Sequence, residues 1–289
     1  MTAPRIPVMK TPKVYVGGAF IRSESGRTFP VRDGAGQFVA NVPQCTRKDL
    51  RNAVEAAAKA GPGWAARTPY NRGQIIYRLA EMLESRADEM TGVLRQFSAA
   101  SATTADGEVA ASTDRLVHYA GWADKYEQVL GSANPVAAPF FNFTLTEPMG
   151  VIGVIASDAH PLLGLISQIA SAITSGNTVV ALASETMPYP ALTLGEMLAT
   201  SDLPGGVVNI ITGFRRELIP TFASHTHIRG VDAVAGGEDA TTLRRGAADS
   251  VKRVTVRKPD IDWTSDANEG AYEMRHFIEF KTVWHPVGA

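Results

Sequence analysis

The sequence predicts an α/β protein built on a doubly wound parallel sheet, with helices before the sheet and a β-stranded arm attached to it. Residues 150–155, Gly-Val-Ile-Gly-Val-Ile, are apolar on both faces, which is typical of a buried strand in a parallel sheet. After them, short apolar runs alternate with helical patterns, as in successive strand–helix–strand units. We expect strands at 178–182, 207–211, 228–234 and 252–256, and helices after 161, at 190–200, near 217–223 and at 238–248.

The residues before this alternation favour hairpins and then helices. Short β-type runs at 14–16 and 38–42 are separated by glycines, which indicates hairpin strands. Thr46-Arg47-Lys48-Asp49 resembles a capping box, and apolar residues then recur at helical spacing up to the Gly-Pro-Gly break at 61–63. Further helices are expected at 71–97 and 108–130.

Two more segments predict strands that lie outside the alternating series. Phe140 to Thr146 alternates like a strand before Pro148, and Phe277 to Trp284 near the C-terminus is mostly β-branched and aromatic. The backbone N–H and C=O groups of a strand need partners. The C-terminal strand therefore requires a neighbouring sheet.

Composition sets bounds on the function. The 289 residues are 45% hydrophobic, and 28 basic against 29 acidic side chains give no electrostatic reason to expect a nucleic acid or an acidic membrane as partner. The sequence has no signal-peptide pattern and no run of about 18 apolar residues, so we expect a soluble cytoplasmic protein. The single cysteine, Cys45, cannot form an internal disulfide.

Several motifs in the predicted order resemble landmarks of the aldehyde dehydrogenase superfamily. These are "EPMGVIGVI", "SGNTVVALASE", "LPGGVVNIITG" and "SVKRVTV" in the α/β part, and "NVPQCTRKDLRNAVEAAAKAGPGWAA" before it. The resemblance covers nearly all of residues 13–257 and implies a Rossmann-like NAD-binding domain. The tail "FIEFKTVW" resembles the family's closing strand, and the family's catalytic domain is missing between the two.

The resemblance also implies a division of the chain. Residues 1–137 and 156–259 are expected to form a discontinuous NAD-binding-type domain, and 138–155 with 271–289 an oligomerisation arm. Residues 260–270 are expected to be a short linker in place of the catalytic domain.

The family's chemistry uses a cysteine nucleophile, a glutamate base and an oxyanion-holding asparagine. The nucleophile belongs to the missing domain, and Cys45 lies where the resemblance puts no catalytic group. Arg257 occupies the glutamate's position and cannot accept a proton. Ala159 occupies the asparagine's position, and its methyl group donates no hydrogen bond. We expect no catalytic activity from this chain alone; Asp158 and His160 favour a solvated loop over a triad.

The positions implied to bind NAD or NADP are degenerate. In the ribose-binding motif Glu185 is kept but Leu182 replaces the lysine. In the pyrophosphate-binding loop Gly236 and Gly237 remain without the family's hydroxyl residues, and acidic residues follow at once. The turn after the 207–211 strand keeps Gly213, but Arg215 replaces its usual companion. We expect no cofactor, with NAD or NADP binding as the alternative.

A metal site is not expected. His225 and His227 alternate, but no third ligand lies nearby in the sequence.

Loss of the chemistry beside retention of the arm predicts a non-catalytic subunit that assembles with a full-length aldehyde dehydrogenase and stabilises or regulates it. The C-terminal strand would then join a sheet of a different polypeptide. An NAD(P)-dependent aldehyde oxidoreductase, a nucleotide-binding module and a homodimer are the alternatives. The residues expected to mediate assembly are Phe277, Ile278, Phe280, Val283 and Trp284.

Overall fold

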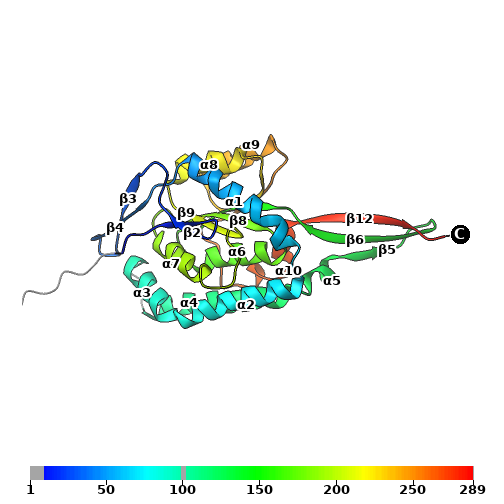
Figure 1. Ribbon diagram of the computed structural model, residues 1–289, viewed down its shortest axis with the longest axis horizontal. Coiled ribbons are helices and arrows are strands. Elements are labelled where there is room, and N and C mark those ends of the chain that lie inside the picture. Colours follow the sequence, from blue (N-terminus) through cyan, green and yellow to red (C-terminus); the bar gives the residue numbers. More distant parts are fainter. Residues whose placement is uncertain (1–9, 99–101, 289) are drawn as a thin grey trace, which may run out of the picture.

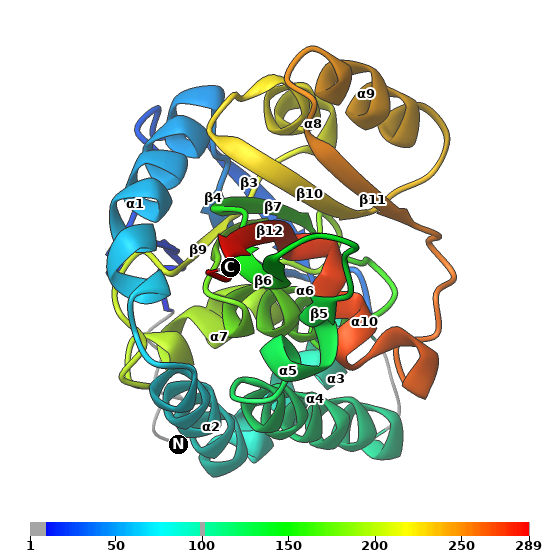
Figure 2. The same ribbon diagram turned by 90° about the vertical axis from the view of Figure 1, so that its right-hand side faces the viewer.

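A seven-stranded sheet organises the computed structural model, which describes residues 10–98 and 102–288 (Figures 1 and 2). The five strands from the edge strand β11 to β9 are parallel to one another. Beyond β9, an N-terminal hairpin continues the sheet with antiparallel pairing. The predicted α/β class and doubly wound sheet are therefore confirmed. From edge to edge the strands are β11 (Arg253–Arg257), β10 (Ile228–Val234), β7 (Val151–Ile155), β8 (Thr178–Leu182), β9 (Val208–Ile211), β1 (Val14–Val16) and β2 (Ala19–Ile21).

Helices cover both faces of this sheet (Figure 2). Every residue of α6 is buried, because this helix lies between the sheet and an outer helical layer. Among the described residues, no helix has the length and apolar character needed to cross a bilayer. One face carries α1 (Arg47–Ala65), α8 (Arg215–Ser224) and α9 (Gly237–Ala248); the other carries α6 (Leu163–Thr174) and α7 (Tyr189–Leu198), with α2 (Pro69–Ser85), α3 (Ala87–Ser98) and α4 (Ala102–Trp122) outside them.

The N-terminal elements differ in detail from the expected ranges. The helix expected at 71–97 is two helices, because Arg86 leaves the helical conformation and its guanidinium binds Glu89 and Glu196. The helix expected at 108–130 ends at Trp122 and is followed by α5 (Tyr126–Leu130). The capping box at the start of α1 is present, and β3 (Thr28–Arg32) pairs with β4 (Phe38–Pro43) in a separate hairpin.

The arm is a three-stranded antiparallel ribbon that extends from the body of the molecule (Figure 1). Its strands are β5 (Ser132–Asn134), β6 (Phe140–Pro148) and β12 (Ile278–Pro286). One edge of the C-terminal strand is paired within this chain, and the expectation that this strand joins a sheet of another polypeptide stays a prediction for its other edge. All nine residues of β12 pair with β6 of the same chain, from Ile278 opposite Pro148 to Pro286 opposite Phe140.

The arm also differs from the expected 138–155 and 271–289, since its first part begins earlier, with β5 at Ser132, and ends earlier, at Pro148. Residues 151–155 form β7 in the central sheet, because both of their faces are apolar and need cover. In the second range, α10 (Ala271–Met274) and the 3-10 turn η2 (Arg275–Phe277) belong to the body, where Phe277 is buried. The C-terminal strand thus begins at Ile278, one residue after the predicted start.

Candidate functional site

The sheet order defines a crevice where a ligand would be expected. From β7 the chain adds β8 and β9 on one side, and then crosses to add β10 and β11 on the other. Neighbouring strands β7 and β10 are therefore the switch point, and crevices at the carboxyl ends of such strands are the usual ligand sites of open parallel sheets. The predicted positions Ala159, Glu185, Gly236 and Gly237 all follow carboxyl ends of strands in this sheet.

The Arg215 side chain lies across the switch point. This first residue of α8 donates from Nη2 to the Ala156 carbonyl at 2.5 Å and from Nη1 to the Val234 carbonyl at 3.4 Å. Ala156 directly follows β7 and Val234 ends β10, so the guanidinium joins the two strands that border the switch point. It also forms an ion pair with Asp158 at 3.2 Å. The sequence indicated only an altered turn here, not an occupied crevice.

Glu185 serves the fold in place of a ligand. Its Oε2 accepts a hydrogen bond from the Arg215 backbone N–H at 2.7 Å, which satisfies one of the unpaired donors at the start of α8. No side chain of the residue before α8 provides a cap. Three residues before Glu185 in the same motif, Leu182 at the end of β8 is fully buried and offers no polar atom to a ribose hydroxyl.

The loop after β7 uses its own N–H groups. Ser157 Oγ accepts from the backbone N–H of Ala159 at 3.1 Å and of His160 at 3.2 Å. The next free N–H groups, those of Leu162 and Leu163, both donate to Glu108 Oε1 at 3.1 Å. The exposed methyl group of Ala159 adds no donor. No oxyanion hole is therefore assembled from these four backbone N–H groups.

Gly236 and Gly237 begin α9 with acidic neighbours. Gly236 is extended, and Gly237 has a φ of 54°, a conformation that favours glycine. Glu238 and Asp239 occupy the first turn, where carboxylates interact favourably with the helix dipole. The same carboxylates oppose a pyrophosphate, which would bring further negative charge to this end of the helix.

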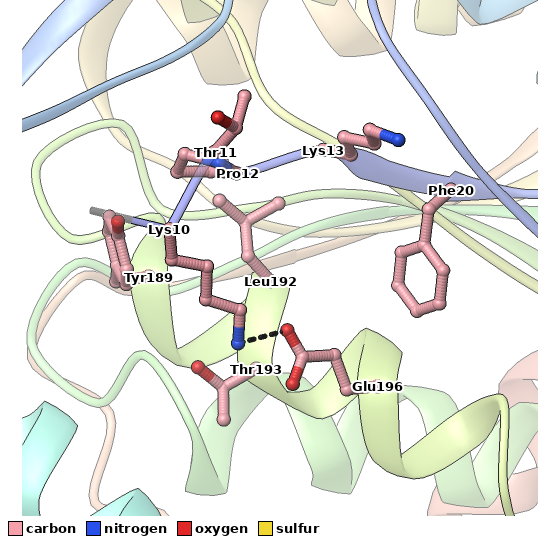
Figure 3. A pocket seen from close by; sticks show the side chains of 9 residues that line it. All are labelled: Lys10, Thr11, Pro12, Lys13, Phe20, Tyr189, Leu192, Thr193 and Glu196. Atoms are coloured by element: carbon pink, nitrogen blue, oxygen red, sulfur yellow. Dashed lines mark ion pairs between the residues drawn. The ribbon is translucent and has the colours of Figure 1, made fainter. Parts of the chain in front are cut away.

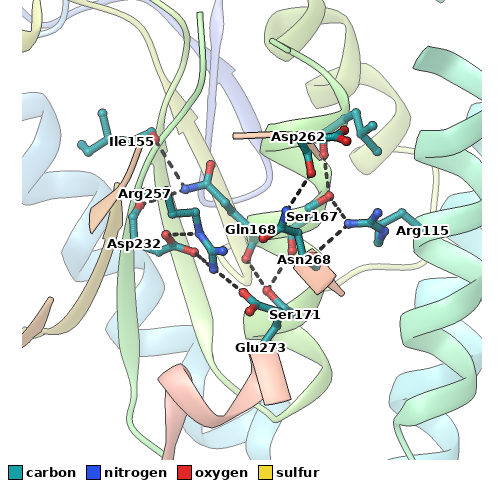
Figure 4. Close-up of polar contacts among 11 residues, drawn as sticks. Arg115, Ile155, Ser167, Gln168, Ser171, Asp232, Arg257, Asp262, Asn268 and Glu273 are labelled. Atoms are coloured by element: carbon teal, nitrogen blue, oxygen red, sulfur yellow. Dashed lines mark hydrogen bonds and ion pairs between the residues drawn. The ribbon is translucent and has the colours of Figure 1, made fainter. Parts of the chain in front are cut away.

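Arg257, at the expected position of the general base, belongs to a buried ion cluster (Figure 4). Its guanidinium binds the fully buried Asp232 through two contacts of 2.7 and 2.9 Å and Glu273 at 2.7 Å. It also lies over the Trp263 ring, 5.2 Å from the centroid. Burial disfavours the charge, but Asp232 and Glu273 outweigh burial and raise the pKa of Arg257 above its usual value. A permanently protonated group cannot act as a base.

The segment that follows Arg257 is a packed part of the body and not a free linker. Residues 260–270 contain the buried Trp263 and the 3-10 turn η1 (Asp266–Asn268). Arg115 of α4 holds them in place. It donates to the Asn268 carbonyl at 3.2 Å (Figure 4). It also donates to the Trp263 carbonyl at 2.7 Å and pairs with Glu269 at 2.7 Å. The linker was expected because the resemblance places the missing catalytic domain here; the sequence signal for packing is Trp263.

Gly164 leaves the space that this tryptophan needs. A Cβ at Gly164 would lie 2.8 Å from Trp263 Nε1, which is closer than real contacts allow. The segment thus packs on α6 through the contact between Trp263 and Gly164, and the tryptophan covers the N-terminal end of the helix.

Cys45 and the histidine pair form no reactive site. Cys45 is fully buried, and burial together with the nearby Asp49 carboxylate raises its thiol pKa to about 12, so the nucleophilic thiolate is suppressed. Burial and His227 lower the pKa of His225. Within residues 10–98 and 102–288, no three metal-ligating side chains gather.

A separate cavity lies at the other side of the sheet, between α7 and the β1–β2 hairpin (Figure 3). Its volume is about 280 Å³, and it is lined by Phe20, Tyr189 and Leu192 among others. An ion pair between Lys10 and Glu196 crosses it. None of the residues that the sequence singled out lines this cavity.

The expected assembly residues divide into two groups. Phe277 and Ile278 are 1% and 0% exposed and anchor the arm, so they present no surface to a partner. Phe280 and Trp284 are 43% and 57% exposed on the ribbon, and Val283 is half-buried. The root of the ribbon is fixed by hydrogen bonds from Arg253 to the Ile278 carbonyl and from Asn177 to the Phe277 carbonyl, at 2.8 and 2.9 Å.

The fold defines the class of protein: an α/β domain of the dinucleotide-binding type that carries a β ribbon. The family model described as "Aldehyde dehydrogenase family" matches residues 20–258. The chain belongs to the aldehyde dehydrogenase family, and the predicted resemblance is confirmed.

Relatives with known names support this assignment. The chain is 32% identical to the mitochondrial aldehyde dehydrogenase of Rattus norvegicus, over 93% of this chain and 54% of that protein. It is 33% identical to retinal dehydrogenase 2 of Gallus gallus, over 93% and 53%. A solved aldehyde dehydrogenase of Bacillus cereus matches with a TM-score of 0.81 and 27% identity, over 86% and 51%. The chain spans about half the length of the curated relatives it matches.

The residues at the crevice do not fit NAD or NADP. Leu182 lacks a polar atom, Glu185 is committed to α8, and the guanidinium of Arg215 stands between β7 and β10. Each of these positions contributes to the fold of the chain itself.

Proposed function

We propose that this chain is a non-catalytic subunit that assembles through its ribbon with a full-length aldehyde dehydrogenase and stabilises or regulates it. The observation that carries the proposal is the contrast between the two regions. The position of the general base lies in a closed ion cluster, whereas the ribbon keeps exposed apolar side chains and an open strand edge.

The ribbon has the features of an interaction surface. Phe280 and Trp284 lie on one face with Phe140, whose ring is 5.8 Å from that of Trp284, edge to face. Phe141 and Leu145 are about half-exposed on the opposite face. A narrow ribbon without a covering layer is marginally stable by itself, so a partner that covers it would lower its free energy.

The open edge of β12 supports a sheet-to-sheet contact. In the three-stranded ribbon β6 is central, and β12 pairs only on its β6 side among the described residues. Strand edges of this kind pair with strands of other chains. The resemblance implies that the sheet of a catalytic domain is the usual partner, and residues 258–277 provide no such sheet. A full-length relative supplies one.

The test is native mass spectrometry after co-expression with a full-length aldehyde dehydrogenase from the same host. We expect a mixed complex, and we expect the double variant Phe280→Asp, Trp284→Asp to reduce it about tenfold or more. Loss of an aromatic anchor at an interface costs about 2 kcal/mol or more. Tyr77→Asp is the matched control, because Tyr77 is 50% exposed on α2, away from the ribbon.

A chain that stays monomeric, or that forms only homodimers, would contradict the proposed partner. A mixed complex unaffected by the ribbon variant would contradict the proposed surface.

A further inference from the structure

We infer that the Arg215 side chain closes the switch point between β7 and β10 and contributes to keeping a dinucleotide out. This inference concerns the parallel sheet alone and does not depend on the ribbon or its partner. It rests on the position of the guanidinium, on the use of its donors and on the way it is held.

The position is the carboxyl end of the two strands that border the switch point. A dinucleotide crosses an open parallel sheet here because the strand order leaves a gap between adjacent loops. The guanidinium bonds to Ala156 O and Val234 O, so it bridges this gap at the level of the last strand residues. The side chain is 16% exposed, which places most of it inside the crevice.

The two terminal nitrogens of the guanidinium contact protein oxygens. Both terminal nitrogens bind backbone carbonyls, and Asp158 balances the charge from 3.2 Å. A pyrophosphate would have to displace this carboxylate and would meet its negative charge. Nε is the remaining donor; it is buried and has no acceptor among the described residues. An anion bound through Nε is thus the competing interpretation, and the experiment separates the two.

The side chain is held in place from two sides. Asp158 Oδ1 accepts from Ser184 Oγ at 2.6 Å and from the Glu185 N–H at 3.1 Å, so the carboxylate that orients Arg215 is itself fixed. Glu185 in turn binds the backbone N–H of Arg215. Because that last contact uses the main chain, a change of the Arg215 side chain leaves the cap on α8 intact.

The experiment is isothermal titration calorimetry of the full chain with NAD and with inorganic pyrophosphate. We expect no binding of NAD by the wild type at millimolar concentration. The variants Arg215→Ala and Arg215→Gly should bind NAD with a dissociation constant at least about tenfold below the highest NAD concentration at which the wild type shows no binding. Arg216→Ala is the matched control and should behave like the wild type, because Arg216 is exposed and lies over Phe214 instead of the crevice.

Two results would overturn the inference. The first is a folded Arg215→Ala variant that binds NAD no better than the wild type. The second is binding of NAD or pyrophosphate by the wild type that is lost in Arg215→Ala, which would make Arg215 an anion-binding residue. Circular dichroism and the unfolding midpoint establish whether each variant is folded. If neither variant folds, the wild type decides, because NAD binding by the unaltered chain contradicts a closed crevice.

Discussion

At the scale of single residues, positions where the resemblance implies catalysis or cofactor binding hold side chains that contact other parts of the same chain. Arg257 takes the position of a base, and Asp232, in the middle of a buried strand, supplies its counter-charge. Glu185 keeps its identity but caps a helix. Each change is consistent with the rule that a buried charge persists only where paired and hydrogen-bonded.

The Arg257–Asp232 pair can be tested by its contribution to stability. Arg257→Gln leaves Asp232 charged, fully buried and without its partner, so the free energy of unfolding should fall by about 3–5 kcal/mol. Urea denaturation measures the change. The double variant Asp232→Asn, Arg257→Gln removes both charges and should recover most of the loss. Equal stability of the two variants would show that the buried charge is not the cause.

At the scale of elements, the segment after β11 packs on the body of the molecule, where the resemblance implied a short linker and the start of the arm. Residues 258–277 are docked on α4 and α6 by Arg115, Trp263 and Glu273, and the ribbon starts where Asn177 and Arg253 hold the chain. The docked segment determines where β12 leaves the body. The direction of the ribbon is thus set by side-chain contacts made before the strand begins.

Replacing Arg115 should loosen this segment without unfolding the sheet. Arg115→Met removes three hydrogen bonds and the ion pair with Glu269, and it leaves the carbonyls of Trp263 and Asn268 without their donor. We expect a loss of about 2–4 kcal/mol in the local opening free energy. Hydrogen exchange followed by mass spectrometry measures it as faster exchange in residues 258–277.

Arg78→Met is the control for that experiment, because Arg78 forms a single exposed ion pair on α2. Uniformly faster exchange across the central sheet would show that Arg115 supports the whole fold instead of the segment.

The whole molecule combines a complete parallel sheet with a crevice used for internal contacts. The family's reaction needs a nucleophile, a base and a cofactor, and the described residues offer a protonated buried thiol, a protonated arginine and a filled switch point. Under the proposed function, the sheet serves as the platform that holds the ribbon.

The purified chain should form no NAD(P)H from aldehyde and NAD or NADP. The expected rate is indistinguishable from that of buffer, because Arg257 cannot take a proton and the Cys45 thiol has a pKa of about 12. Absorbance at 340 nm measures it. Cys45→Ala serves as the control: turnover by the wild type that this variant loses would identify Cys45 as a nucleophile and contradict the proposed role.

The sequence by itself determined the family and the parallel sheet, because periodicity and motif chemistry are local properties, and it predicted the loss of the catalytic positions. Leu182, Ala159 and Arg257 lack the required groups whatever surrounds them. Only the tertiary structure decided what the replacements do. The partners of Arg215 come from the loop after β7 and from the end of β10, and those of Arg257 from β10 and α10. Contacts between residues this far apart in the chain depend on the packing of the whole sheet, and no spacing in the sequence records them.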